Sequence, residues 1–505
     1  MSRAVFGGLA AAAVGLALVL RLAGLDLRPM HHDEANQAVK FGALLETGQY
    51  LYDSNDHHGP TLYYLTLPSA WARGQATLAS LDERTLRVVP ALFGAGLVLL
   101  VASLAGVLGR QAAAAGALLA ALSPALSYYS RSYIQESLFT FFALAFLIAL
   151  GRWVTAPRAA WAAGAGIAAG LAHATKETSL IVLGAAAVAA LVARRWTTAP
   201  RPAGRLAAHL VLGLGTALAV TFILYSSFFA NPSGLLDSFR ALGVYLERGI
   251  DPGPHGQRWD YYLRLLAWSA SGGLVWTEGL TLALAVAGLA AAAGRARAGF
   301  WPRYVALYTA FAALVFSLIR YKTPWNVLPF HVGFVLLAGL GASVLIDGAR
   351  SRLVRGLLVL VLAAGALHLG AQSWRASFRY PADPRNPYVY AQTSPDFLRL
   401  VQRIADVSAL HPDGTHMPVK VVAGPYEQWP LPWYLRRMDR VGYWTDAAGA
   451  GPLDHAPVII ASQEQGPAID RALGDRYVSE FFGLRPEVLL TLYIDRTLWA
   501  QFLQR

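Results

Sequence analysis

The feature that most constrains the fold of this chain is a series of long apolar segments separated by short polar loops. A helix of about 20 apolar residues crosses the hydrocarbon core of a bilayer, so the sequence predicts about eleven membrane-spanning helices, with eleven to thirteen as the range. The predicted segments are Val5–Leu22, Leu86–Leu108, Ala112–Tyr129, Ser137–Trp153, Ala159–His173, Ser179–Val192, Leu206–Phe228, Gly272–Ala293, Arg303–Ile319, Val327–Leu345 and Leu353–Gly370.

The composition supports a membrane protein and excludes several other classes. Hydrophobic residues make up 55% of the 505 residues and charged residues only 14%, whereas soluble domains carry about 25% charged residues. The formal net charge is +12, but the positive charge is not gathered in one tail or patch, which argues against nucleic-acid binding. Because there is no cysteine, disulfides, thiolate nucleophiles and cysteine-ligated zinc are excluded.

Arginine is concentrated in alternate loops, and this asymmetry predicts the orientation. Cytoplasmic loops of membrane proteins are enriched in Lys and Arg, so the arginine-rich set is predicted to be cytoplasmic. The first apolar segment lacks an A-x-A-type cleavage signal and is predicted to be retained. The predicted external set is residues 31–60, 130–136, 176–177, 230–271 and 321–325, and the cytoplasmic set contains Arg3, Arg110, Arg152, Arg158, Arg194, Arg195, Arg201, Arg205, Arg295, Arg297, Arg303, Arg350, Arg352 and Arg355.

The chain divides into two predicted domains. Residues 1–372 form the transmembrane domain, with a long first external loop over 24–85 that contains a short apolar helix at Thr61–Trp71. An odd number of spans places residues 373–505 outside as well. This tail has strand-like runs such as Val419–Ala423 and a helical stretch at Phe397–Ala409. Strands that alternate with helices predict a small extracytoplasmic α/β domain.

The first external loop opens with His31-His32-Asp33-Glu34, directly after the first apolar segment. A carboxylate at a membrane surface is costly unless it is solvated, paired or used. Asp33 or Glu34 could act as a general base toward an acceptor hydroxyl or amine, or hold a divalent cation. The alternative is that Asp33 caps a helix that begins at Glu34 or Ala35, since Asp is a favoured N-cap residue. Capping and catalysis do not exclude each other.

Histidines in two clusters of this loop suggest a possible metal site. His31 and His32 lie beside the two carboxylates, and His57 and His58 lie in the second cluster, Asp56-His57-His58-Gly59-Pro60. Imidazole and carboxylate together suit zinc or manganese, and magnesium is a further candidate. Adjacent histidine side chains diverge, so at most one of each pair would bind the ion. Histidines that are hydrogen-bonded in a polar cleft explain the same pattern.

Two further external segments carry cations and acids that could contact substrate. In Arg131–Glu136, the arginine could bind a phosphate in a bidentate fork, or it could form an ion pair with Glu136 that links two helix ends. In Arg320-Tyr321-Lys322-Thr323-Pro324-Trp325, two cations occupy the side that topology disfavours. An anionic lipid head group explains them, as does snorkelling of the two side chains from the flanking helices.

These motifs resemble the GT-C glycosyltransferases, membrane enzymes that use polyprenyl-phosphate sugars, among them the lipid A aminoarabinose transferases and the protein O-mannosyltransferases. Asp33-Glu34 stands where that superfamily has an acidic motif in the first external loop. The segment from His58 to Tyr64 is similar to their Lys-Pro-Pro-Leu-x-Tyr, and the segment from Arg87 to Gly94 is similar to their Arg-x-x-Pro-Ala-Leu-x-Gly. Where those relatives have the Lys that lies near the donor phosphate, this chain has His58.

A narrower resemblance, over nearly the whole chain, is to the family named after an archaeal flippase-activity-associated protein. It rests on His31–Ala35, His58–Pro60, Tyr321–Trp325 and Asn386–Tyr390. The wider resemblance implies transfer of a sugar from a polyprenyl-phosphate donor to a lipid, glycan or protein acceptor at the outer face of the membrane. The high Ala, Arg and Gly content indicates a prokaryotic cytoplasmic membrane. The alternative is a flippase, or an accessory to one, that binds lipid-linked sugar without cleaving it.

The resemblance also implies roles for individual residues. Asp33 and Glu34 are expected to be catalytic, and a divalent metal bound by His31, His32 or His58 is possible. The expected substrate-binding residues are His58, Arg131, Glu136, Arg320, Lys322 and Trp325. For the enzyme hypothesis to hold, Asp33, Arg131 and Lys322 should converge on one cavity that is open to both lipid and water.

Overall fold

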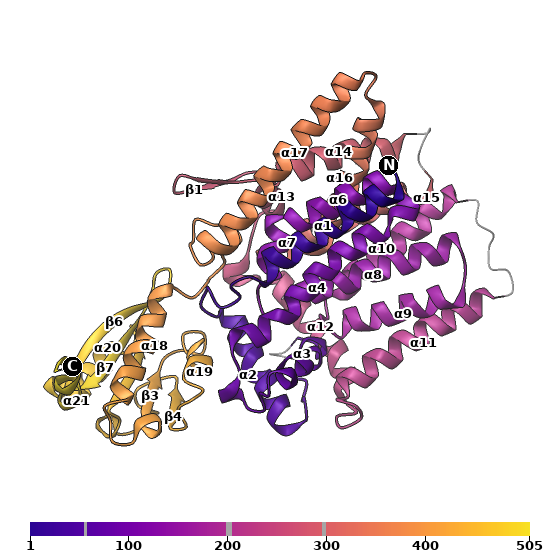
Figure 1. Ribbon diagram of the computed structural model, residues 1–505. Coiled ribbons are helices and arrows are strands. Elements are labelled where there is room, and N and C mark those ends of the chain that lie inside the picture. Colours follow the sequence, from indigo (N-terminus) through magenta and orange to yellow (C-terminus); the bar gives the residue numbers. More distant parts are fainter. Residues whose placement is uncertain (55–57, 198–204, 295–298, 505) are drawn as a thin grey trace.

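The computed structural model describes residues 1–54, 58–197, 205–294 and 299–504, which form a long helical bundle with a smaller β-sheet domain at one end (Figure 1). Each of the eleven predicted apolar segments contains a bundle helix. These helices are α1 (Arg3–Leu22), α4 (Glu83–Ser103), α6 (Arg110–Leu122), α8 (Glu136–Thr155), α9 (Ala159–His173), α10 (Ser179–Ala193), α11 (Leu206–Tyr225), α14 (Gly279–Ala293), α15 (Phe300–Leu318), α16 (Leu328–Gly348) and α17 (Arg352–Trp374).

The chain is an integral membrane protein by the length and apolarity of its helices. Within the described residues, seven helices are long and apolar enough to cross a membrane, and α6 and α14 are shorter apolar helices. The count of eleven crossings therefore stays a prediction. Helices α11 and α17 are almost wholly exposed in the protein alone, and their outward faces are rows of Leu and Val, as lipid-facing surfaces require. The seven are Arg3–Leu22, Glu83–Leu108, Glu136–Thr155, Ser179–Trp196, Leu206–Tyr225, Pro324–Gly348 and Arg352–Arg379.

Short elements gather at the end of the bundle away from the N-terminus, beside the C-terminal domain (Figure 1). The predicted helix at Thr61–Trp71 is confirmed as α3. The expected span at Gly272–Ala293 is wrong in its first seven residues, because Gly272 and Gly273 form the turn of a β-hairpin and the helix begins only at Gly279. These elements are α2 (His32–Thr47), α3 (Thr61–Ala72), α7 (Pro124–Tyr129), α12 (Gly234–Ile250), α13 (Tyr261–Ala267), β1 (Ser269–Ser271), β2 (Leu274–Trp276) and the 3-10 turn η4 (Pro324–Val327); α5 (Ala105–Leu108) lies at the opposite end.

Glycines let the bundle helices approach closely. A Cβ added at Gly288 of α14 would lie 1.9 Å from the carbonyl oxygen of Leu337, and one added at Gly341 of α16 would lie 2.0 Å from that of Leu284. In lipid the hydrophobic effect does not drive helices together, so close van der Waals packing of small residues replaces it. The α14–α16 contact therefore depends on these two glycines.

We expect Gly288→Ala to destabilise the bundle by about 1–3 kcal/mol, because the new methyl group forces two backbones apart. The control is Gly8→Ala in α1, where an added Cβ meets nothing within 4 Å; there the better helix propensity of Ala should leave stability unchanged or slightly raised. Thermal unfolding of the detergent-purified protein measures both. Equal melting temperatures for the two variants would contradict the packing argument.

The C-terminal domain is a five-stranded sheet covered by helices, as the alternating pattern of the tail predicts. Its strand order is β4-β3-β5-β7-β6, with β3 parallel to β4 and β5, and β7 antiparallel to β5 and β6. Helix α17 runs on as a π-helix, η5 (Arg375–Arg379), past the predicted boundary at residue 373. The elements are α18 (Pro395–Ser408), β3 (Val419–Val422), α19 (Leu431–Tyr434), β4 (Val441–Trp444), β5 (Val458–Ser462), α20 (Gly466–Leu473), β6 (Tyr477–Arg485), β7 (Val488–Asp495) and α21 (Arg496–Leu503).

The C-terminal domain is docked on the first loop by specific polar contacts. The indole Nε1 of Trp433 donates to Glu83 at 2.9 Å, and Arg436 donates to the carbonyl oxygen of Leu81 at 2.7 Å. The backbone N–H of Met30 donates to the Tyr434 hydroxyl at 2.8 Å, one residue before the His31 cluster. The domain therefore lies at the same end of the bundle as the polar motifs of the sequence.

Candidate functional site

The N-terminus of α2 sets the positions of the four motif residues. His31 is the N-cap: its Nδ1 accepts from the backbone N–H of Asp33 at 3.0 Å, while Glu34 reaches back and accepts from the backbone N–H of His31 at 3.0 Å. This reciprocal arrangement is a capping box. The expectation that Asp33 caps a helix starting at Glu34 or Ala35 is wrong, because the helix already begins at His32. Asp33 instead stands in the first turn.

Asp33 and Glu34 have opposite environments. The side chain of Asp33 is 41% exposed, and its nearest charged partner is His31, with 3.8 Å between Oδ2 and Nδ1. Glu34 is fully buried, and both its oxygens accept from Arg87, at 2.7 and 2.9 Å. It also accepts from the backbone N–H of Tyr133 at 2.8 Å. Only Asp33 therefore presents a carboxylate that a substrate can reach.

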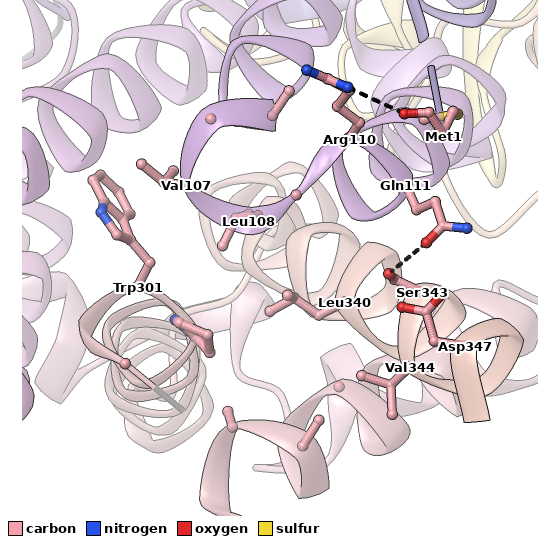
Figure 2. A pocket seen from close by; sticks show the side chains of 18 of the residues that line it. Met1, Val107, Leu108, Arg110, Gln111, Trp301, Leu340, Ser343, Val344 and Asp347 are labelled. Atoms are coloured by element: carbon pink, nitrogen blue, oxygen red, sulfur yellow. Dashed lines mark hydrogen bonds between the residues drawn. The ribbon is translucent and has the colours of Figure 1, made fainter. Parts of the chain in front are cut away.

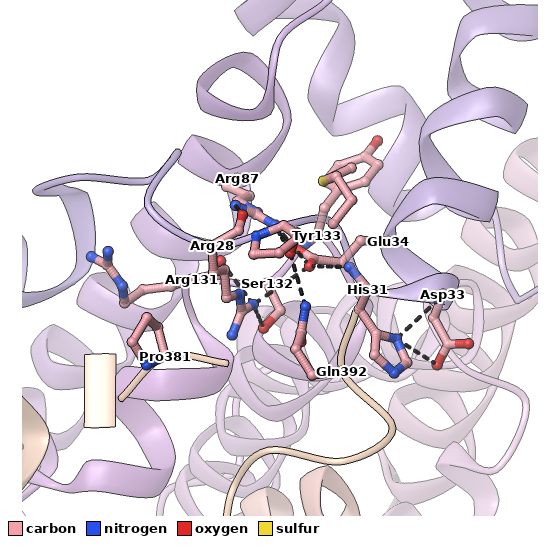
Figure 3. A network of polar contacts seen from close by, with 12 residues as sticks. Arg28, His31, Asp33, Glu34, Arg87, Arg131, Ser132, Tyr133, Pro381 and Gln392 are labelled. Carbon is pink, nitrogen blue, oxygen red and sulfur yellow. Dashed lines mark hydrogen bonds and ion pairs between the residues drawn. The ribbon is translucent and has the colours of Figure 1, made fainter. Parts of the chain in front are cut away.

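The charge of Glu34 is fixed by its surroundings (Figure 3). Burial alone would raise the pKa of this carboxyl, but Arg87 and Arg28, together with the hydrogen bonds, outweigh burial and hold the pKa at about 2. A carboxylate that is paired and fully hydrogen-bonded cannot serve as a general base near neutral pH. The geometry thus makes Glu34 a residue that holds the N-terminus of α2 in place.

Aromatic rings form a cluster close to Asp33. Trp325, in η4, lies 5.9 Å from the His31 ring, 6.2 Å from Tyr129 and 5.7 Å from Tyr390, measured between ring centroids. The second ring nitrogen of His31 lies 3.0 Å from the carbonyl oxygen of Tyr390. Burial, together with the charges of Tyr321 and Asp33, raises the pKa of Tyr390 to about 12. These contacts place the His31 ring, at the start of α2, against Trp325 and Tyr390.

Lys322 is connected to the same aromatic cluster by residues of the loop between α12 and α13. Its backbone N–H donates to the carbonyl oxygen of His255 at 3.1 Å, and the His255 ring is hydrogen-bonded to the Tyr390 hydroxyl. The Lys322 ammonium donates to the carbonyl oxygen of Ile319, and burial lowers its pKa. Arg320 is exposed. Lys322 is thus a buried cation that is linked to Tyr390 through His255.

A turn between α9 and α10 supplies residues that sequence reasoning underrated. Lys176 donates to Glu136 at 2.8 Å and to Asn326, the neighbour of Trp325, at 2.9 Å. The alternative of an Arg131–Glu136 ion pair is therefore wrong, because Glu136 pairs with Lys176 instead. Lys176 and Glu177 are adjacent in the sequence, and nothing local to them reveals that each pairs with a residue far along the chain.

Glu177, from the same turn, holds His58. The carboxylate is fully buried and accepts from the hydroxyls of Tyr52 at 2.9 Å and Tyr225 at 3.2 Å, and one oxygen lies 3.3 Å from His58 Nδ1. Burial would raise the pKa of Glu177, but the hydrogen bonds, above all that of His58, lower it. Gly59 is required here because a Cβ would lie 2.1 Å from the carbonyl oxygen of Ala174.

Arg131 does not lie beside Asp33. Its guanidinium donates to carbonyl oxygens at the C-terminal end of α1, including those of Ala23 at 2.6 Å and Gly24 at 2.7 Å. A cation there balances the partial negative charge of the helix end. Figure 3 shows Arg131 and Asp33 at opposite ends of the polar network. Arg131 therefore lies apart from Asp33, and the convergence of Asp33 and Lys322 on one cavity stays a prediction.

The described residues do not fit a metal site. No group of three or more His, Asp or Glu side chains that could hold an ion occurs among residues 1–54, 58–197, 205–294 and 299–504. Each ring nitrogen of His31 already contacts backbone, the His32 ring lies against Tyr426 and Trp429, and His58 faces Glu177. His57 lies outside the described residues.

A large hollow lies at the opposite end of the bundle and contains none of the predicted site residues. Its volume is about 890 Å³, and Arg110, Gln111, Trp301, Ser343 and Asp347 are among its lining residues (Figure 2). This hollow belongs to the arginine-rich end. Size alone therefore does not mark the site in this molecule, and the chemistry points to the α2 end.

Comparison with known proteins agrees with this architecture. Residues 67–225 match the model of the family described as dolichyl-phosphate-mannose-protein mannosyltransferase, a segment that runs from α3 to the end of α11. No curated protein sequence matches the chain. The family match covers less than half of the chain, so the remaining residues are compared with known proteins through the fold alone.

The fold is shared over nearly the whole length with solved GT-C structures. ArnT from Cupriavidus metallidurans bound to undecaprenyl phosphate matches with a TM-score of 0.62 and 17% identity, over 96% of this chain and 98% of that one. The archaeal oligosaccharyltransferase AglB from Archaeoglobus fulgidus, in complex with an inhibitory peptide and a dolichol-phosphate, gives 0.59 and 15%, over 98% and 76%. The expected resemblance to the GT-C fold is confirmed.

Proposed function

We propose that this GT-C-fold membrane protein is a glycosyltransferase that moves a sugar from a polyprenyl-phosphate donor to an acceptor at the outer face of the membrane. The observation that carries the proposal is the exposed Asp33 carboxylate, held in the first turn of α2 beside His31, whose ring lies 5.9 Å from that of Trp325; the buried Lys322 belongs to the same segment as Trp325. A base, an aromatic surface and cations are the groups that this reaction needs. The solved relatives bound to undecaprenyl phosphate and dolichol-phosphate support the donor class.

In the proposed reaction Asp33 takes the proton of an acceptor hydroxyl or amine as the acceptor atom attacks the anomeric carbon. The bond between that carbon and the phosphate oxygen breaks, and polyprenyl phosphate leaves with the bonding electrons. Attack from the face opposite the leaving group inverts the anomeric configuration. Asp33 needs only to lie near the acceptor, and its side chain is 41% exposed.

The leaving phosphate needs positive charge, because stabilisation of charge that develops in the transition state is a large part of catalysis. We assign this role to Lys322, with Arg320 at the exposed rim, and we assign to His58, which stands where the relatives have a Lys, a hydrogen-bonding contact with the phosphate. Lys176 and Glu136 then position Asn326 and Trp325, and Trp325 offers an aromatic face to the sugar. Arg131 is left with a structural role, since α1 carbonyls already occupy its N–H groups.

The outer-face assignment follows from the arginine distribution. The α2 end carries the acids and aromatic clusters, and the opposite end carries the arginine-rich loops, which the positive-inside rule assigns to the cytoplasm. The C-terminal domain, docked on the first loop through Trp433 and Arg436, then covers the site from outside. A lipid, a glycan or a protein acceptor would reach Asp33 between this domain and the bundle.

The test is to incubate the purified protein with a polyprenyl-phosphate sugar and an acceptor extract, and to measure free polyprenyl phosphate. A transferase releases it in proportion to sugar transferred. A flippase or accessory protein binds the same lipid and releases none, so binding without release would favour that alternative and overturn the proposal. The span interiors favour the enzyme, because transporters place their polar groups near mid-membrane and here they gather at one end.

A further inference from the structure

Helix α12 (Gly234–Ile250), at the α2 end of the bundle (Figure 1), has three distinct sides among the side chains that the structure describes. One side is buried against the bundle. The opposite side is exposed and is divided into an apolar strip and a charged strip. Successive residues of an α-helix are about 100° apart, so the members of the apolar strip lie within about 60° of one another. The buried side is Gly234, Ser238 and Ala241, the apolar strip is Leu236, Phe239, Gly243 and Ile250, and the charged strip is Arg240 and Glu247.

The buried side of α12 is fixed to the ends of two bundle helices through His173, the last residue of α9. The hydroxyl of Ser238 lies 3.3 Å from Nε2 of this histidine, and the hydroxyl of Ser179, the first residue of α10, lies 3.2 Å from Nδ1. The ring of Phe239 stacks on the same imidazole, with 5.3 Å between the ring centroids. Helix α12 is therefore held at the level where α9 and α10 end.

The turn between α11 and α12 has a backbone conformation that is unfavourable for its residues. The φ angles of Ser227, Phe228 and Phe229 are 50°, 55° and 76°, in the left-handed region that bulky residues rarely adopt. In this conformation the two phenylalanines are 55% and 64% exposed. Water would penalise the exposed rings in addition to the backbone, whereas lipid around the rings removes the first of these costs.

The exposed phenylalanines continue the apolar surface of α11, which is long and apolar enough to cross a membrane. An exposed row on α11 consists of Leu210, Leu214 and Leu218, spaced four residues apart. The next residue of this row is Phe222, and its ring lies 5.7 Å from that of Phe229, measured between centroids. The surface that lipid covers along α11 thus extends to the turn that leads into α12.

We propose that α12 lies in the head-group region of the bilayer at the α2 end, with its apolar strip and the two phenylalanine rings of the preceding turn in lipid. The charged strip, Arg240 and Glu247, then faces water. An apolar side that borders a charged side is typical of helices that lie in a membrane surface. Membrane lipid covers the strip, rather than a protein partner, because the strip follows directly on the lipid-facing surface of α11.

The lipid contact supports the turn between α9 and α10. Helix α12 is attached to His173, and Lys176 and Glu177 follow three and four residues later in that turn. Those two residues contact Asn326 and His58. Lipid that holds α12 in place therefore also steadies these contacts. The position of α12 in the membrane does not depend on the reaction proposed for Asp33.

The experiment is fluorescence quenching of single-cysteine variants, which is possible because the chain has no cysteine of its own. Ile250→Cys tests the apolar strip, and Arg240→Cys is the matched control on the charged strip, since both side chains are highly exposed. Each full-length variant carries an environment-sensitive NBD label in nanodiscs of phosphatidylcholine and phosphatidylglycerol. The quenchers are aqueous iodide and lipids with a nitroxide either near the head group or near the chain end.

We expect iodide to quench the Ile250→Cys label several-fold less than the Arg240→Cys label, and the nitroxide near the head group to quench it more than the one near the chain end. Leu214→Cys, in the middle of α11, should show the reverse order of the two nitroxides. Equal access of iodide to both α12 labels would overturn the proposal. So would an Ile250→Cys label that neither iodide nor the nitroxides reach, since protein would then cover the strip, or one quenched best from the chain end. If Ile250→Cys does not fold, Leu236→Cys on the same strip must meet the same expectations.

Discussion

Asp33→Asn should lower the rate of sugar transfer by roughly 10²- to 10⁴-fold, the range that general-base catalysis contributes. An amide has the shape of the carboxylate but cannot take the acceptor proton. The fold should be unaffected, because the Asp33 side chain is 41% exposed and its ionic contact among the described residues is a 3.8 Å approach to His31. Transfer is measured as free polyprenyl phosphate released per minute, and folding as the melting temperature.

The matched control for Asp33 is Asp26→Asn. Asp26 lies in the same loop, its side chain is 44% exposed, and its carboxylate pairs with Arg84 at 2.9 Å. Loss of an exposed ion pair costs about 1 kcal/mol or less, so this variant should retain the full transfer rate. If Asp33→Asn transfers sugar as fast as Asp26→Asn while both fold, Asp33 is not the base, and the central assignment fails.

The membrane architecture could be predicted from the sequence because its signals are local. A run of apolar residues as long as a bilayer is thick predicts a helix at its own position, and all eleven runs contain one. The alternating pattern of the tail likewise predicts its sheet. The prediction fails where local signals compete. Asp is common at N-cap positions, which favours Asp33, whereas in the structure His31 is the N-cap and Glu34, three residues later, completes its capping box.

The site could be predicted only in part, because its partners lie far apart in the chain. Asp33, Lys322 and Trp325 were named from charge and position, and they do gather at one end. By contrast, the pairs Glu34–Arg87 and Lys176–Glu136 join residues from different helices, and no spacing rule connects them. Glu34 adjoins Asp33 in the sequence and Glu136 is near Arg131, which favours a functional role for each of the two glutamates. The buried ion pairs that they form in the structure argue against both roles.

The Glu34–Arg87 pair predicts an effect on stability, whereas the Asp33 substitution is expected to affect activity. Glu34→Gln should lower the free energy of unfolding by about 3–5 kcal/mol, because it leaves Arg87 buried without its counter-charge. Folding of this variant, measured by yield and melting temperature, should suffer far more than that of Asp33→Asn. Neighbouring carboxylates thus have separate functions, one chemical and one structural.

The pH dependence of stability gives an independent measure of the same pair. The pKa of Glu34 is about 2 in the folded protein, below its ordinary value of 4.5, so its contribution is fully present above pH 4.5 and is lost as the pH falls toward 2. The shift corresponds to about 3 kcal/mol at neutral pH. The stability gap between the unaltered protein and Glu34→Gln should therefore narrow on acidification.

A double-mutant cycle decides whether the two side chains act as a unit. Arg87→Gln alone leaves Glu34 without its main counter-charge and should lower stability as much as Glu34→Gln does. The double variant removes both charges, so it should be more stable than the sum of the two single effects predicts, with a coupling energy of about 1–3 kcal/mol. Recovery will be incomplete, because the Leu25 and Pro29 carbonyls lose the donor groups that Arg87 supplies. Strict additivity would show that the pair does not hold α2, and the orientation of Asp33 would then need another explanation.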